Sequence, residues 1–197
     1  MRLYLVRHGE TVGTVIKKYH GITDVNLDKK GVAQVKRLAK KLDKIDFSAA
    51  YSSNLKRCVH TAKIILKNKK TTLKTTRGLR EIDFGRWEGM TFEEMQSNDG
   101  FLFDKWFRDL PNFTMPGGES TKSMQKRITQ EMERITKRHK NGNILVVSHG
   151  GPIRVVLCNV LNVSMQDFWH MSIDTASLSI IEKVDGFSMV KQMNMVV

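Results

Sequence analysis

The stretch Leu3-Tyr4-Leu5-Val6-Arg7-His8-Gly9-Glu10-Thr11 changes abruptly from apolar to polar residues. Its four apolar residues, which are followed by a turn, are typical of a strand that is buried on both faces of a sheet. In an open parallel sheet, ligands bind just beyond the carboxyl ends of such strands. A guanidinium, an imidazole and a glycine at that place suit an anion with a nucleophile beside it.

A second stretch repeats this arrangement late in the chain. The apolar run Ile144-Leu145-Val146-Val147 leads directly into Ser148-His149-Gly150-Gly151. Two predicted buried strands therefore each deliver a histidine that precedes a glycine, and both histidines are predicted to lie at strand ends.

The composition is that of an ordinary globular protein, and the length is sufficient for one sizeable α/β domain. The chain has 197 residues, of which 40% are hydrophobic and 27% charged, and it contains no repeat or low-complexity linker. We therefore expect a single domain over residues 1–197. No apolar run approaches the roughly 20 residues of a membrane span. The four apolar residues before Arg7 are too few for a signal peptide, so we expect a cytoplasmic protein with no membrane partner.

The net charge of +13 raises the question of a nucleic-acid surface. The lysines, however, are scattered over several predicted helices and are not interleaved with aromatic residues. This pattern favours a solvated surface that attracts anionic substrates, and we expect no nucleic-acid partner. The two cysteines, Cys58 and Cys158, lack metal-ligand spacing and are predicted to be buried, reduced thiols.

Strand and helix patterns alternate along the rest of the chain. Strands are predicted at 3–6, 47–51, 71–75, 143–148, 176–183 and 187–193, and helices begin near Asp28, Ser52 or Ser53, Thr91, Phe101, Ser120, Pro152 and Ser164. Residues 11–26 are predicted to form mostly a loop over the site. Strands separated by helices predict a mostly parallel sheet, and Asp185-Gly186 predicts a final antiparallel hairpin.

Five side chains near predicted strand ends could together perform phosphoryl transfer: Arg7, His8, Arg57, Glu81 and His149. Guanidiniums match the oxygens of a phosphate and offset its charge. A neutral imidazole can act as a nucleophile, and a carboxylic acid can give a proton to the leaving alkoxide. Each residue taken singly is also compatible with a structural role, such as an ion pair between the glutamate and a neighbouring arginine.

The stretch from Arg7 to Thr11 resembles the signature of the histidine phosphatase superfamily, which has the phosphoglycerate mutase-like fold. Three further segments match in the family's order, namely 52–57 with Thr61-Ala62, 79–89 and 147–151. The match extends over nearly the whole chain. It implies a three-layer α/β/α sandwich with a mostly parallel central sheet and a C-terminal antiparallel hairpin.

The resemblance also implies a role for each of the five residues. His8 would be the phosphorylated nucleophile, and Arg7, Arg57 and His149 would form the phosphate pocket. Glu81 would be the proton donor and then the base that activates water. The family uses no metal, and we expect no other cofactor.

Four further residues are expected to contribute to substrate binding. Gly150 follows the second histidine, and His20 with Gly21 could line the pocket. The family often has asparagine where this chain has Thr14, which puts the positioning of the substrate in question but not the core chemistry.

The substrate is expected to be a small-molecule phosphomonoester. Residues 85–89, 116–120 and the tail from Phe168 to Ile181 look most like α-ribazole phosphatases of cobalamin synthesis. Broad-specificity phosphatases and sugar-phosphate or phosphoglycerate phosphatases share most of these features. The chain looks short for a phosphoglycerate mutase. The sequence leaves a homodimer open.

Two interpretations from other classes compete with a phosphatase. A metal hydrolase could use His8, His149 and Glu81, but ligands paired at helix or strand spacing are missing, so no metal site is expected. A basic nucleic-acid-binding module is the non-enzymatic alternative, and it would show an affinity that falls steeply with salt.

Overall fold

Six strands form one sheet in the order β3-β2-β4-β1-β5-β6. The computed structural model describes all 197 residues. The strands are β1 (Arg2–Arg7), β2 (Phe47–Ser53), β3 (Leu73–Thr76), β4 (Asn143–Ser148), β5 (Leu178–Val184) and β6 (Phe187–Met195). The pairs β1–β4, β2–β4 and β2–β3 are parallel, whereas β5 runs antiparallel to both β1 and β6. The predicted mostly parallel sheet with a C-terminal hairpin is confirmed.

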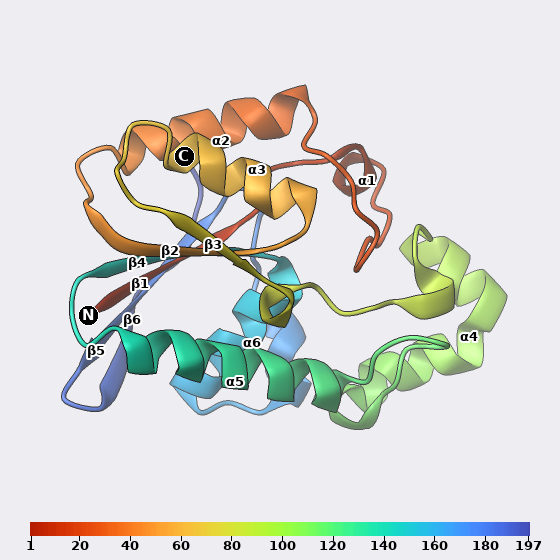
Figure 1. The fold of residues 1–197 in the computed structure, drawn as a ribbon. Helices are drawn as coiled ribbons and strands as arrows, with labels where there is room; N and C mark the ends of the chain where they lie inside the picture. Colours follow the sequence, from red (N-terminus) through yellow and green to blue (C-terminus); the bar gives the residue numbers. More distant parts are fainter.

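Helices cover both faces of this sheet and make three layers (Figure 1). The helices are α1 (Val12–Val15), α2 (Lys29–Lys41), α3 (Lys56–Ile65), α4 (Phe92–Arg108), α5 (Thr121–Arg138) and α6 (Gly150–Leu161), with 3₁₀ turns η1 (Arg77–Leu79), η2 (Gly85–Trp87), η3 (Leu110–Asn112) and η4 (Met165–His170). In Figure 1, α2 and α3 lie above the sheet, α5 and α6 lie below it, and α4 lies beyond the strand ends. None of the helices has the length and apolar character needed to cross a bilayer.

The central strand β1 is buried on both faces, as its apolar run predicts. Tyr4 and Val6 belong to a cluster of 15 buried residues on the side of α2 and α3. Leu3 and Leu5 point the other way, into a cluster of 30 buried residues that includes α5 and α6. The second cluster is larger because it continues past the sheet into an aromatic block around Trp106, beside the end of the strands.

Most predicted helix starts are confirmed by side-chain caps. Asp28, Ser120 and Ser164 each accept a hydrogen bond from a backbone N–H in the first turn, and Thr91 forms a full capping box. The predicted caps of α3 by Ser52 or Ser53 are wrong. Both serines remain in β2, which is longer than predicted, and the helix starts after Leu55 without a side-chain cap.

Two segments differ in detail from the expectation. Residues 11–26 are mostly loop, but Val12–Val15 forms one helical turn, capped by Thr11. The two helices expected around Thr91 and Phe101 are merged into α4, which is kinked where Asp99 has non-helical angles (φ −137°, ψ 42°). The Asp99 carboxylate accepts a hydrogen bond from the indole Nε1 of Trp87 at 2.8 Å. This contact ties the kink to the aromatic block.

We expect Trp87→Ala to lower the free energy of unfolding by about 3–5 kcal/mol, the usual cost of deleting a large core aromatic side chain. Trp87 is fully buried, and its ring stacks on Phe113 with centroids 5.7 Å apart. Urea denaturation would measure the loss. The control is Phe101→Ala in α4, where the side chain is 83% exposed and a change within about 0.5 kcal/mol is expected. Equal losses in both variants would contradict this account of the core.

Candidate active site

The parallel pairing of β1 with β4 brings the two histidines together. The register pairs Arg7 with Ser148, so His8 and His149 leave the sheet side by side. Their ring centroids lie 5.1 Å apart with an angle of 68° between the planes. Both rings are buried, with 5% and 1% of the residue exposed.

The neighbours of His8 select the protonation state of its ring. The Nδ1 atom lies 2.8 Å from the carbonyl oxygen of Gly9. A carbonyl can only accept, so Nδ1 carries the proton and Nε2 keeps its lone pair. Burial and the guanidiniums of Arg57 and Arg7 hold the pKa of His8 well below its ordinary value of 6.5. The ring is therefore a neutral imidazole at neutral pH, as a nucleophile requires.

Arg57 is buried beside the histidines, and the protein itself occupies most of its hydrogen-bond donors. Its Nε donates to Nδ1 of His149 at 3.2 Å, and its terminal nitrogens donate to the carbonyls of His20, Gly21 and Thr23 at 2.6–3.1 Å. A guanidinium has five N–H groups, so this arrangement leaves Arg57 mainly its charge and at most one free donor for a ligand. It does not present the free two-pronged face that bidentate binding of a phosphate would use.

Arg7 is better placed to bind an anion. One terminal nitrogen donates to the carbonyl of Ile173 at 2.6 Å, whereas the buried Nε has no partner. A Cβ atom added to Gly150 would lie 3.7 Å from the Arg7 guanidinium and 3.4 Å from Nη1 of Arg154. Two guanidiniums therefore converge above a glycine at the start of α6. Burial lowers the pKa of both arginines, but an arginine side chain still remains protonated.

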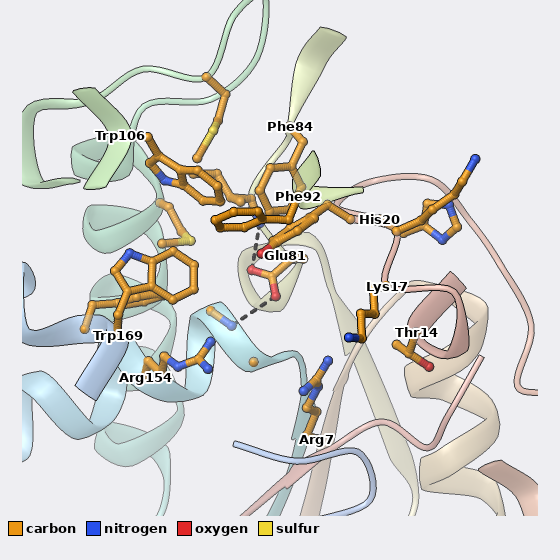
Figure 2. A pocket seen from close by; sticks show the side chains of 18 of the residues that line it. Arg7, Thr14, Lys17, His20, Glu81, Phe84, Phe92, Trp106, Arg154 and Trp169 are labelled. Carbon is orange, nitrogen blue, oxygen red and sulfur yellow. Dashed lines mark hydrogen bonds between the residues drawn. The ribbon is translucent and has the colours of Figure 1, made fainter. Parts of the chain in front are cut away.

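Two backbone N–H groups fix the carboxylate of Glu81. Its Oε2 accepts from Gly151 at 3.0 Å, and its Oε1 accepts from Ile82 at 3.0 Å; Figure 2 shows both bonds as dashed lines. The backbone of this segment is held in turn by Arg127, which donates to the carbonyls of Gly78, Arg80 and Glu81. Glu81 thereby lies across the cavity from Arg7 (Figure 2).

These side chains surround one cavity of about 520 Å³. Seven of the nine residues expected to form the site line it: Arg7, His8, Thr14, His20, Arg57, Glu81 and Gly150. The other two, His149 and Gly21, lie behind the wall and contact Arg57 instead. His149 accepts from Arg57 through Nδ1, so its Nε2 carries the proton that is donated to Ser53 Oγ at 2.9 Å.

Thr14 and His20 line the cavity, but the surrounding protein restricts both side chains. The Thr14 hydroxyl donates to the carbonyl of Thr11 and accepts from its N–H, both at 2.8 Å. The His20 ring lies against Gly13, and burial lowers the pKa of His20.

The predicted burial of both free thiols is confirmed, and Cys58 Sγ lies 3.4 Å from Nε2 of His149.

Two features of the cavity were not predicted from the sequence. Three further cations line it, Lys17, Lys18 and Arg154, and so do six aromatic side chains, Tyr19, Phe84, Phe92, Trp106, Phe168 and Trp169. Figure 2 shows Trp106 and Trp169 on the side of the cavity away from Arg7. The guanidinium of Arg154 lies over the rings of Phe168 and Trp169, 5.3 Å from each centroid. The only available signal was the place of Arg154 one turn into the helix after His149.

No group of three or more histidine, cysteine, aspartate or glutamate side chains is arranged to hold a metal ion. The donors that face the cavity are mainly nitrogen cations, which suit an anion.

Comparison with known proteins identifies the family. The model of the histidine phosphatase superfamily (branch 1) matches residues 3–196. The chain belongs to this superfamily. Phosphoserine phosphatase 1 of Hydrogenobacter thermophilus is 34% identical over 194 residues, which are 98% of this chain and 92% of that protein.

Relatives that are named for a different substrate have a comparable identity to this chain. The adenosylcobalamin/α-ribazole phosphatase of Salmonella typhimurium is 29% identical over 98% of this chain and 96% of its own length. The crystal structure of the α-ribazole phosphatase from Shigella flexneri superposes with a TM-score of 0.91 at 27% identity, covering 99% of this chain and 96% of that one. These comparisons confirm the fold and the family and leave the substrate to be argued from the cavity.

We expect Gly151→Ala to displace the carboxylate of Glu81 and lower phosphatase activity by roughly 100-fold or more, the range of a lost general acid–base group. The added Cβ would lie 2.2 Å from Glu81 Oε1, which is too close for a non-bonded carbon and oxygen, so the carboxylate would have to move. Steady-state rates on p-nitrophenyl phosphate and on an alkyl phosphate would measure the effect.

The matched control is Gly100→Ala in α4, where the added Cβ has no neighbour within 4 Å. It should keep wild-type rates. Wild-type activity in Gly151→Ala, with the protein folded, would show that the position of the Glu81 carboxylate does not matter.

Proposed function

We propose that this phosphatase hydrolyses small-molecule phosphomonoesters through a phosphohistidine on His8. The neutral Nε2 of His8 would attack phosphorus while Arg7, Arg154 and the charge of Arg57 offset the negative charge of the phosphoryl group. The bond from phosphorus to the ester oxygen would break, and Glu81 would give that oxygen its proton. The observation that supports this step most directly is the Nδ1–H bond of His8 to Gly9, which leaves Nε2 free to react.

The second half of the reaction would return the enzyme to its starting state. Glu81, now ionised, would take a proton from a water molecule whose oxygen attacks phosphorus. The bond from phosphorus to His8 Nε2 would break, and inorganic phosphate would leave. His149 lies behind the cavity wall. It would orient Arg57 by accepting the hydrogen bond from Arg57 Nε through Nδ1, and it would not contact the phosphate itself. The steps use no metal, so activity should persist in excess chelator.

We infer the substrate class from the aromatic side of the cavity. The rings of Trp106 and Trp169 lie with centroids 5.3 Å apart and form a wall that a planar apolar group can contact. This wall favours an alcohol with an aromatic part, and α-ribazole 5′-phosphate of cobalamin biosynthesis fits this description. The Salmonella typhimurium relative, which is named for this activity, supports the same choice.

Phosphoserine is the second candidate. Lys17, Lys18 and Arg154 line the cavity together with Glu93, so a small zwitterionic alcohol would also find groups of opposite charge. The Hydrogenobacter thermophilus relative carries this activity in its name. Broad-specificity, sugar-phosphate and phosphoglycerate phosphatases of the same superfamily remain the further alternatives. Rates on α-ribazole 5′-phosphate, phosphoserine, 3-phosphoglycerate and sugar phosphates would rank them.

We expect His8→Ala to lose on the order of a thousandfold or more in kcat, as is typical when a nucleophile is removed. Quenched wild-type enzyme should carry acid-labile phosphate from a radioactive substrate, and the variant should carry none. Label that persists on the variant would place the nucleophile elsewhere.

We expect Trp169→Ala to lower kcat/KM for α-ribazole 5′-phosphate about 10-fold or more relative to phosphoserine, because an apolar contact with the alcohol is lost. The exposed and remote substitution Phe187→Ala should leave the ratio unchanged. An equal fall in kcat/KM for both substrates in Trp169→Ala would show that the aromatic wall does not determine substrate choice.

A further inference from the structure

The carboxylate of Glu88 lies at the centre of a set of hydrogen bonds outside the cavity lining. Its oxygens accept from three consecutive backbone N–H groups, those of Gly21 at 2.9 Å, Ile22 at 3.0 Å and Thr23 at 3.3 Å. They also accept from the Thr23 hydroxyl and from the N–H of Phe84 at 3.2 Å. One partly buried carboxylate thus tethers the loop of residues 20–23 to the segment that carries the 3₁₀ turn η2.

The same loop holds Arg57 through its carbonyl groups. The guanidinium donates to the carbonyls of Gly21 at 2.6 Å, Thr23 at 2.7 Å and His20 at 3.1 Å. Donors of the loop therefore face an anion, Glu88, and acceptors of the loop face a cation, Arg57. Hydrogen bonds to charged groups are shorter and stronger than neutral ones, so the two ions fix the loop between them.

The loop can approach this closely because residue 21 is glycine. A Cβ atom there would lie 1.8 Å from the carbonyl oxygen of Ile82 and 2.5 Å from Glu88 Oε1. The loop is exposed at Ile22 and Thr23, and the residue after it, Asp24, accepts a hydrogen bond from the backbone N–H of Lys56 at 2.7 Å.

We propose that Glu88 is a positioning residue for the phosphate site and that it acts through loop 20–23 on the guanidinium of Arg57. This inference rests on the proposed role of Arg57 in binding the phosphoryl group. Without the carboxylate, the loop carbonyls lose their fixed places, and the cation they hold no longer sits at a defined distance from His8. The phosphate would be bound more weakly whatever alcohol it carries.

Glu88→Gln tests this with the smallest change of shape. The amide keeps one acceptor oxygen but turns the other position into a donor that faces backbone N–H groups. We would measure the affinity for inorganic phosphate by calorimetry, together with kcat/KM for p-nitrophenyl phosphate and phosphoserine. The variants are Glu88→Gln, Arg57→Ala and the double variant. We expect Glu88→Gln to weaken phosphate binding about 10-fold or more and to lower kcat/KM by the same factor for both esters.

The double variant distinguishes a positioning role from a general structural role. If Glu88 acts through Arg57, Glu88→Gln should have little further effect once Arg57 is alanine, because coupled residues are not additive. The matched control is Glu94→Gln, which removes a carboxylate that accepts a backbone N–H at the start of α4 and should keep wild-type phosphate affinity.

Wild-type phosphate affinity in Glu88→Gln, or effects that add in the double variant, would overturn the inference. If Glu88→Gln does not fold, Thr23→Val removes only the hydroxyl bond to Glu88, and the same cycle with Arg57→Ala decides the question through a smaller effect. Unchanged phosphate affinity in Arg57→Ala would also overturn it. A wild-type protein that binds phosphate but hydrolyses no ester would refute the proposed hydrolysis alone, because the role of Glu88 is read from binding.

Discussion

The parallel pairing of β1 with β4 is the constraint on which the rest of this molecule depends. The strands are remote in the chain, at residues 2–7 and 143–148, yet their register sets Arg7 opposite Ser148. A shift by one residue would turn each following side chain to the other face of the sheet. Such a shift would exchange side chains as different in shape as Tyr4 and Leu5 between two separate close-packed cores, so packing opposes it. The position of His8 beside His149 therefore follows from core packing.

The site gathers cations in a buried place, which is costly unless each one is paired or hydrogen-bonded. Backbone carbonyl groups accept most of the hydrogen bonds that stabilise these buried cations. Ile173 accepts from Arg7, Met171 accepts from Arg154, and the loop before α2 accepts from Arg57. Carbonyl groups of loops are available as acceptors because they are not hydrogen-bonded within a sheet or a helix. The two buried histidines stay neutral beside these cations. Burial contributes most to lowering the pKa of each ring, and the positive charge of Arg57 contributes next.

The larger of the two cores also shapes the cavity. Trp87, Trp106 and Phe103 belong to it, and the aromatic block continues outward to Phe92 and Trp169 at the cavity wall. The same packing that stabilises α4 thus supplies the apolar side of the site. Changes in this block are expected to alter stability and substrate choice together, whereas changes at the phosphate end affect every ester alike.

The sequence by itself determined the strand and helix order, most caps, and the residues that follow β1 and β4, because these signals are local. Periodicity and cap chemistry lie within a few residues, and the hairpin at Asp185 needs only its own turn. Tertiary structure alone decided that His149 lies behind the wall, that Arg154 and Trp169 face the cavity, and that Glu88 reaches the loop at Gly21. The partners in these contacts are remote in sequence, and only the packing of the sheet and its helices brings them within hydrogen-bond distance.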